Sequence, residues 1–149
     1  MPVLVAPLAR LRDVAVAVGH NLESIELIDV PHSHAAAVHA ATMAAAGEVG
    51  MLMQGSLAGG ELLDAVRTRP ELATERRLSH VFHADMPLYD RPLLIADALL
   101  HARPGLAEKA DIVRNAVMLA HALGLARLAA SHAGVSSSDV SDLNSPQPI

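Results

Sequence analysis

Residues that suit anion chemistry flank two apolar runs, Leu78–Ala84 and Pro92–Ala96. Arg76 and Arg77 come just before the first run, and Asp97 follows the second. The turn-rich link between the runs predicts a hairpin. In an antiparallel pair, the start of one strand lies beside the end of the other. We therefore expect the two arginines and the carboxylate to share one edge of a sheet.

Each of these side chains has two interpretations. A guanidinium offers a bidentate fork for phosphate, but an arginine pair at a strand mouth is also an ordinary solvated feature. Asp97 ends an apolar run, so it is expected to be partly buried with a perturbed pKa, either as a base or as a helix cap or ion-pair partner. Ser79 lies near the same edge and is a supporting candidate beside Asp97.

A second candidate is the glycine-rich turn Gln54–Gly60, which precedes a helical pattern. Gly55 and Ser56 could cradle an anion with backbone N–H groups. The turn does not match a P-loop, and an ordinary glycine turn into a helix fits it equally well. In a parallel sheet the ligand crevice lies at the carboxyl ends of the strands. This turn, the arginines and Asp97 are therefore expected to converge.

The nine histidines raise the question of a metal site. His32 and His34 form an H-x-H pair, and His80 and His83 are close in sequence. Residues three apart on a strand point to opposite faces, and no cysteine or H-E-x-x-H motif completes a zinc set. No metal site is expected.

The elements that must position these residues alternate along the chain. Strands are expected at 3–5, 24–30 and 49–53, and helices at 8–18, 34–46, 61–69 and 108–123. Ser33 is the expected cap of the second helix. Alternation of this kind predicts an α/β fold with three layers, built on a mostly parallel sheet with one antiparallel hairpin strand.

Composition narrows the function classes. The 149 residues suit one domain, taken as 1–130, and its many alanines predict a core with little bulk. The serine-, aspartate- and proline-rich residues 131–149 are expected to be disordered. A net charge of −5 argues against nucleic acid and membrane surfaces as partners, and without a leader or a long apolar stretch the expected location is the cytoplasm.

Several blocks of the chain resemble the phosphate acetyl/butyryltransferase family, in particular the transferase part of bifunctional enoyl-CoA hydratase/phosphate acetyltransferase proteins. The strongest blocks are Val30–Ala37, Leu72–Phe82, Pro92–Ala98 and Lys109–Gly124. They occur in the family's order and at its natural spacing, which makes the resemblance more specific than any single motif.

The resemblance implies an α/β fold of the isocitrate/isopropylmalate dehydrogenase type and transfer of an acyl group between coenzyme A and inorganic phosphate. Coenzyme A would be a substrate, and no tightly bound cofactor is expected. The resemblance also implies that phosphate or the coenzyme is bound by Gly55, Ser56, Arg76 and Arg77. Ser79 and Asp97 would support them, and a homo-oligomer is a further expectation.

The chain also departs from the family. Members usually read M-K-G-x-L-H-T where this chain has 53–59, so the lysine is replaced by Gln54, and I-T-D-A-A-I-N where it has 95–101, so the last asparagine is replaced by His101. Nothing after residue 130 resembles the family's second domain, which we therefore expect to be missing. We therefore expect an incomplete, truncated enzyme with weak or no activity alone. The alternative is a non-catalytic remnant or interaction module that binds coenzyme A, phosphate or a partner subunit.

Overall fold

The computed structural model describes residues 1–58 and 60–125. They belong to two compact units, Met1–Thr74 and a second unit that begins at Glu75. The tail predicted for 131–149 lies outside the described residues. Within the described part, no helix is long and apolar enough to cross a membrane.

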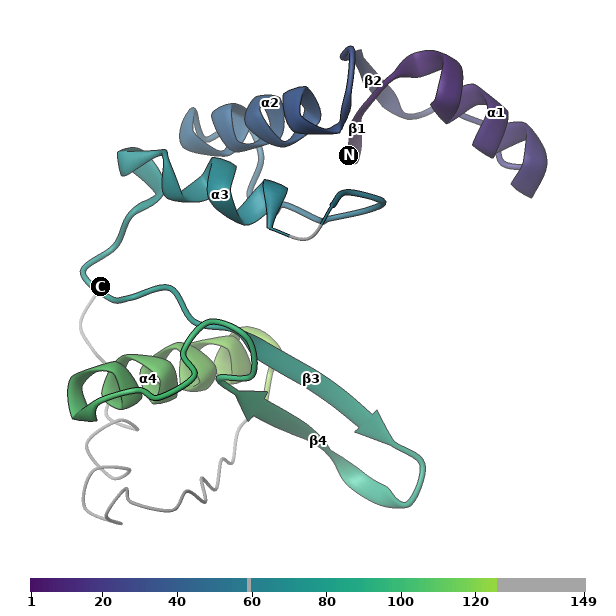
Figure 1. Cartoon of the computed structure of the whole chain (residues 1–149). Helices are drawn as coiled ribbons and strands as arrows, with labels where there is room; N and C mark the ends of the chain where they lie inside the picture. Colours follow the sequence, from purple (N-terminus) through teal and green to yellow (C-terminus); the bar gives the residue numbers. More distant parts are fainter. Residues whose placement is uncertain (59, 126–149) are drawn as a thin grey trace. The chain divides into compact units, whose positions relative to one another are not determined.

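The first unit begins with a parallel strand pair. Strands β1 (Val3–Ala6) and β2 (Glu26–Asp29) pair in parallel, and helix α1 (Leu8–Val18) connects them (Figure 1). The Asp29 carboxylate accepts a hydrogen bond of 2.9 Å from the backbone N–H of Leu8, which caps α1. The helix ends at Gly19, whose φ of 66° is left-handed. These elements confirm the prediction for the first part of the chain.

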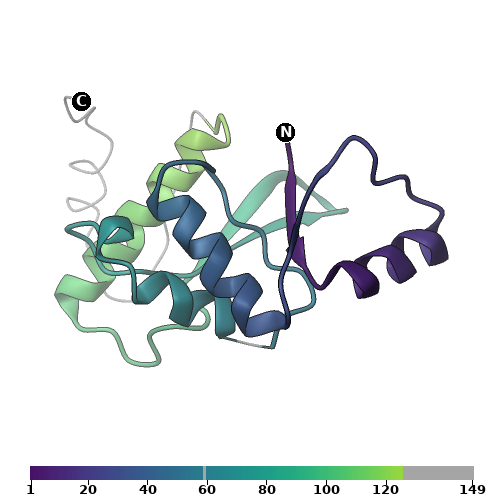
Figure 2. The same ribbon diagram turned by 90° about the horizontal axis from the view of Figure 1, so that it is seen from above.

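Helices α2 (Ser33–Ala45) and α3 (Glu61–Arg67) form the core of the first unit and lie side by side (Figures 1 and 2). Ala37 and Ala41 of α2 are fully buried against Ala65 of α3. Alanine has no side chain beyond Cβ, so the helices approach closely and little bulk is buried, as predicted. A short 3-10 helix, η1 (Pro70–Leu72), follows.

Two predictions for this unit were wrong. Residues 49–53 form no strand: their backbone is irregular, and Met51 and Met53 are 84% and 92% exposed. An apolar run becomes a strand only where a neighbouring strand pairs with it. The cap of α2 is His32, whose Nδ1 accepts a hydrogen bond of 3.1 Å from the Ala35 N–H, whereas Ser33 is already the first helical residue.

The second unit contains the predicted hairpin. Strands β3 (Val81–Met86) and β4 (Tyr89–Ala96) are antiparallel, with Val81 opposite Ala96. Both strands extend further toward the turn than predicted, which leaves only Pro87 and Leu88 between them. Helix α4 (Leu106–Ala122) packs against β4 (Figure 1).

The described residues therefore form two separate two-stranded sheets, β1–β2 and β3–β4. The α/β class is confirmed, with a small parallel sheet and an antiparallel hairpin. The predicted single, mostly parallel sheet of three layers was wrong for the described residues, because no strand forms at 49–53 and the strands make two separate pairs.

Candidate functional site

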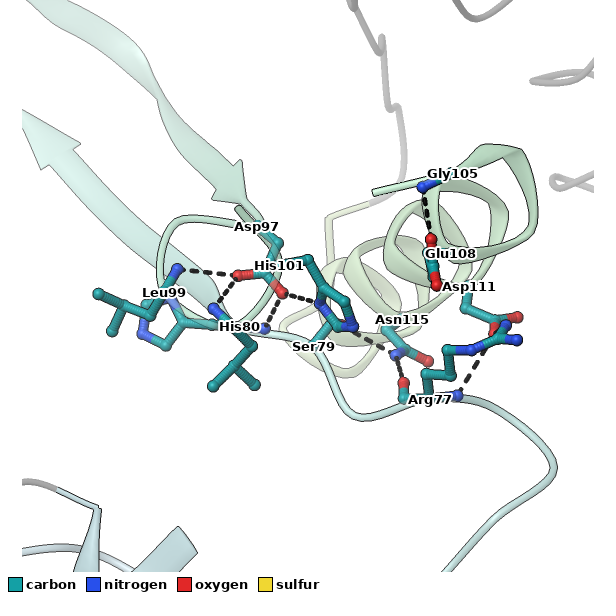
Figure 3. Close-up of polar contacts among 11 residues, drawn as sticks. Arg77, Ser79, His80, Asp97, Leu99, His101, Gly105, Glu108, Asp111 and Asn115 are labelled. Carbon is teal, nitrogen blue, oxygen red and sulfur yellow. Dashed lines mark hydrogen bonds and ion pairs between the residues drawn. The ribbon is translucent and has the colours of Figure 1, made fainter. Parts of the chain in front are cut away.

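The carboxylate of Asp97 lies buried at the open end of the hairpin (Figure 3). Its side chain is 1% exposed. Because Ala96 pairs with Val81, Asp97, the first residue after β4, comes to lie beside His80. The backbone N–H of His80 donates a hydrogen bond of 3.2 Å to Asp97 Oδ2. The predicted position of Asp97 next to the start of the first hairpin strand is confirmed.

The loop after β4 folds back onto the same carboxylate. The backbone N–H groups of Leu99 and Leu100 each donate to Asp97 Oδ1 at 2.9 Å. The imidazole Nδ1 of His101 lies 2.8 Å from Asp97 Oδ2, and the His101 side chain is 21% exposed. Asp97 thus accepts four hydrogen bonds, three of them from the backbone, in the manner of an aspartate that organises a turn.

Opposing effects act on the pKa of Asp97. Burial alone raises the pKa of this carboxyl. The hydrogen bond from His101 lowers the pKa, and so do those from the backbone N–H groups of Leu100, Leu99 and His80. The hydrogen bonds outweigh burial and hold the pKa of Asp97 well below its usual range. A carboxylate with so low a pKa is a poor general base, so the arrangement favours Asp97 as an ionised group that orients its neighbours.

A second polar cluster ties the segment before β3 to helix α4 (Figure 3). Asp111 Oδ2 lies 3.0 Å from Arg77 Nη1 and accepts a longer bond of 3.4 Å from the Arg77 backbone N–H. Asn115, one helical turn further on, donates from Nδ2 to Arg77 O and Ser79 Oγ, both at 2.9 Å. Two side chains of α4 therefore fix the backbone from Arg77 to Ser79 beside the hairpin.

The two predicted arginines differ in their surroundings. Arg77 pairs with Asp111, whose side chain is only 12% exposed, while the Arg77 side chain remains 54% exposed. Half of its surface is thus still accessible to a ligand. Arg76 Nη1 lies 2.6 Å from the sulfur of Met118 on helix α4.

Gly55 and Ser56 lie in the first unit, in the irregular segment before α3. The carboxylate of Glu61, in the first turn of α3, accepts hydrogen bonds of 3.3 Å from the Ala58 N–H and from the Ser33 hydroxyl. The Ala58 N–H of the expected anion cradle is therefore already bonded to the negatively charged carboxylate of Glu61.

The structure thus brings Arg77, Ser79 and Asp97 together at one end of the hairpin, all in the second unit. The rings of His32 and His34 stack with their centroids 6.4 Å apart. Among residues 1–58 and 60–125, no group of three or more histidine and acidic side chains is placed to hold a metal ion.

Three residues of the network escaped the sequence analysis as site residues: His101, Asp111 and Asn115. Asp111 and Asn115 are four apart on one helix, next to the apolar stripe, and such spacing puts both on one face. The sequence signal for Asp111 and Asn115 was therefore their position beside the apolar stripe of the helix. For His101 the signal was weaker, since it depends on how the loop after β4 folds.

Comparison with known proteins identifies the family. The model of the family described as "Phosphate acetyl/butaryl transferase" matches residues 22–145. The chain belongs to this family. All the predicted site residues, and His101, lie inside the matched range.

Curated members of the phosphate acetyl/butaryl transferase family resemble the chain over most of its length. A phosphate acetyltransferase of Rhizobium meliloti is 45% identical over 125 residues, and one of Rickettsia felis is 41% identical over 121 residues. A phosphate butyryltransferase of Clostridium acetobutylicum is 30% identical over 124 residues. These matches cover 83%, 80% and 83% of the chain but 40%, 35% and 41% of the relatives. The chain therefore spans about two fifths of the relatives' length.

Proposed function

We propose that this chain takes part in the transfer of an acyl group between coenzyme A and inorganic phosphate. The observation that carries the proposal is the family match over residues 22–145. The names of the relatives include both acetyl and butyryl transfer to phosphate. In such a reaction the negative acyl phosphate must be held by cations and N–H donors.

Supporting geometry comes from the open end of the hairpin. Arg77 keeps half of its side chain exposed while Asp111 and Asn115 fix its backbone, so its guanidinium can meet an anion from an anchored position. Arg76, Gly55 and Ser56 are further proposed contacts with phosphate or the coenzyme. Ser79 and Asp97 are proposed to hold these groups in place.

The resemblance to the family also supports proposals on the fold type, the role of coenzyme A and the assembly of the chain. We assign residues 1–130 to a transferase-like part of the isocitrate/isopropylmalate dehydrogenase type, close to the transferase part of bifunctional enoyl-CoA hydratase/phosphate acetyltransferase proteins. Coenzyme A is then a substrate rather than a bound cofactor. A cytoplasmic homo-oligomer is the proposed working form. Equilibrium sedimentation tests the assembly directly.

Activity of these 149 residues alone is proposed to be weak, since they match only 40% of the Rhizobium meliloti relative. The test mixes the purified chain with acetyl or butyryl phosphate and coenzyme A and follows thioester formation. A slow rate that rises in proportion to chain concentration supports the proposal. No thioester, together with no thermal shift from coenzyme A, sinks it.

A non-catalytic binding module is the second candidate. It is favoured by Glu61, whose carboxylate takes the Ala58 N–H in the proposed cradle, and by Gln54 at the position where the resembled family has lysine. Binding of coenzyme A in calorimetry without any thioester formation, even at high chain concentration, selects this candidate over the enzyme.

A further inference from the structure

Two arginine side chains meet at one carboxylate of helix α4. Arg77 Nη1 donates a hydrogen bond of 3.0 Å to Asp111 Oδ2 (Figure 3), and Arg114 Nη1 lies 3.8 Å from Asp111 Oδ1. The Asp111 side chain is only 12% exposed, whereas those of Arg77 and Arg114 are 54% and 52% exposed. The negative charge is therefore covered, and the two positive charges beside it remain accessible.

Charge is not balanced in this cluster of Arg77, Asp111 and Arg114. In the part of the chain that the structure describes, Asp111 is the only acidic residue that forms an ion pair with either arginine. One carboxylate neutralises one of the two guanidinium groups, so the cluster keeps one positive charge. This excess is opposite in sign to the net charge of −5 of the whole chain. An accessible positive excess of this kind attracts a small anion.

Most N–H donors of the two arginines are available to such an anion. A guanidinium group has five N–H donors. The Arg77 guanidinium uses Nη1 on Asp111. At 3.8 Å, Arg114 Nη1 is too far from the carboxylate for a hydrogen bond, and within the described ranges the Arg114 guanidinium makes none. Arg114 therefore keeps its whole fork for another acceptor.

The cluster also has a fixed geometry. Asp111 and Arg114 are three residues apart on α4, so they lie on the same side of the helix. The Arg77 backbone is bonded to that helix, because its N–H donates to Asp111 at 3.4 Å and its carbonyl accepts from Asn115 at 2.9 Å. An anion bound here orders few further groups, which limits the entropic cost of binding.

A phosphate group suits this arrangement. Both Nη1 atoms approach the same carboxylate, so the oxygens of one phosphate group can contact both guanidinium groups. The guanidinium fork matches two phosphate oxygens in spacing and direction. Asp111 reduces the repulsion between the two positive charges, which explains why a carboxylate belongs to a site for anions.

We propose that Arg77 and Arg114 together bind a terminal phosphate group, with Asp111 holding the two guanidinium groups beside each other. The identity of the ligand rests on the proposed acyl transfer. Two reactants of that transfer carry a terminal phosphate group, namely inorganic or acyl phosphate, and coenzyme A through its 3′-phosphate. Arg114 is the new member of the site and extends it from the segment before β3 onto helix α4.

A purely structural role for Arg114 predicts no effect on binding. Its ion pair with Asp111 is long and half exposed, and pairs of this kind contribute little to stability. Arg114→Gln should therefore fold with an unchanged urea midpoint, so that binding can be measured in an intact protein.

Calorimetric titration of the full 149-residue chain tests the site. Coenzyme A, dephospho-coenzyme A, which lacks the 3′-phosphate, and inorganic phosphate are each titrated into the wild type, Arg114→Gln and Arg12→Gln. Arg12 is an exposed residue of α1, so Arg12→Gln makes the same change of net charge and is the matched control. We expect Arg114→Gln to raise the Kd of the phosphate ligand about tenfold, as for loss of a charge-assisted hydrogen bond, and Arg12→Gln to leave it unchanged.

The three ligands identify the source of the phosphate. If the site binds the 3′-phosphate, Arg114→Gln lowers the affinity for coenzyme A to that for dephospho-coenzyme A and leaves the affinity for inorganic phosphate unchanged. If the site binds inorganic or acyl phosphate, the affinity for inorganic phosphate falls and the affinities for both coenzymes do not change. Either pattern supports the proposal.

Other outcomes overturn the proposed site. If the wild type binds coenzyme A or phosphate and Arg114→Gln binds them with the same Kd, the site is overturned while the proposed function stands. An equal loss in Arg12→Gln shows a general effect of charge, and an equal loss for both coenzymes excludes a terminal phosphate; each overturns the site. If the wild type binds none of the ligands, the site is overturned, and the thioester assay decides the proposed function separately.

Discussion

Replacing Asp97 by alanine should lower the free energy of unfolding of the second unit. The loss should be larger than for any other carboxylate among the described residues of that unit. The change leaves four donors without their acceptor, namely the backbone N–H groups of His80, Leu99 and Leu100 and the Nδ1 of His101. The side chain is 1% exposed, so water does not replace the lost acceptor at once. Leaving a buried donor without its acceptor costs about 1–3 kcal/mol, so the loss of several such bonds together costs about 3–5 kcal/mol. We expect a loss of that size, against a total stability of about 5–15 kcal/mol for a typical domain.

Urea unfolding followed by tyrosine fluorescence measures this loss. Tyr89 is the single tyrosine of the chain and lies in β4, so its emission reports on the hairpin. Asp85→Ala is the matched control, because Asp85 is an exposed carboxylate in β3 and its removal should change stability by no more than about 0.5 kcal/mol. Equal unfolding midpoints for Asp97→Ala and Asp85→Ala would refute the reasoning that the buried network holds the open end of the hairpin.

Three further outcomes follow from the same structure. The pKa of Asp97 in the folded chain lies below its unfolded value of about 3.9, so the stability that ionised Asp97 contributes is complete above about pH 5 and declines as the pH falls below about 4. Urea midpoints at pH 3 and pH 6 should therefore differ less in Asp97→Ala than in the wild type. Asn115→Ala removes the two hydrogen bonds that Asn115 Nδ2 donates to Arg77 O and Ser79 Oγ and should cost about 2 kcal/mol by the same urea assay, with Asp85→Ala again as the control. Gly60→Ala places a side chain on a residue with a φ of 94°, and circular-dichroism melts should show a loss of stability of about 1–2 kcal/mol. Gly55→Ala is the control: its φ is ordinary and no atom lies within 4 Å of the added Cβ, so its stability should not change.

Local signals predicted the parts of the fold that depend on local chemistry. Two apolar runs around a turn-rich link were sufficient to predict the β3–β4 hairpin, and that pairing alone placed Asp97 beside the segment that begins at Arg76. The limits of α1 were likewise set by Pro7 before it and Gly19 after it, because these residues start and stop helices for steric reasons.

The parts that sequence reasoning missed depend on tertiary partners. The run at 49–53 has the composition of a strand but no strand beside it. His32 caps α2 through a ring nitrogen, where the usual preference for a hydroxyl favoured Ser33. Asp111 and Asn115 acquire their role only when α4 packs beside the residues that precede β3, and no pattern within α4 specifies that neighbour.

Amide chemical shifts of the ¹⁵N-labelled chain during a titration with coenzyme A test the central claim most directly. The account predicts saturable changes that are largest at Arg77, Ser79 and His101, with the α1 amides unaffected. Saturable changes confined to other parts of the chain, or no changes at millimolar coenzyme A, would contradict the claim that the open end of the hairpin binds the substrate of this family member.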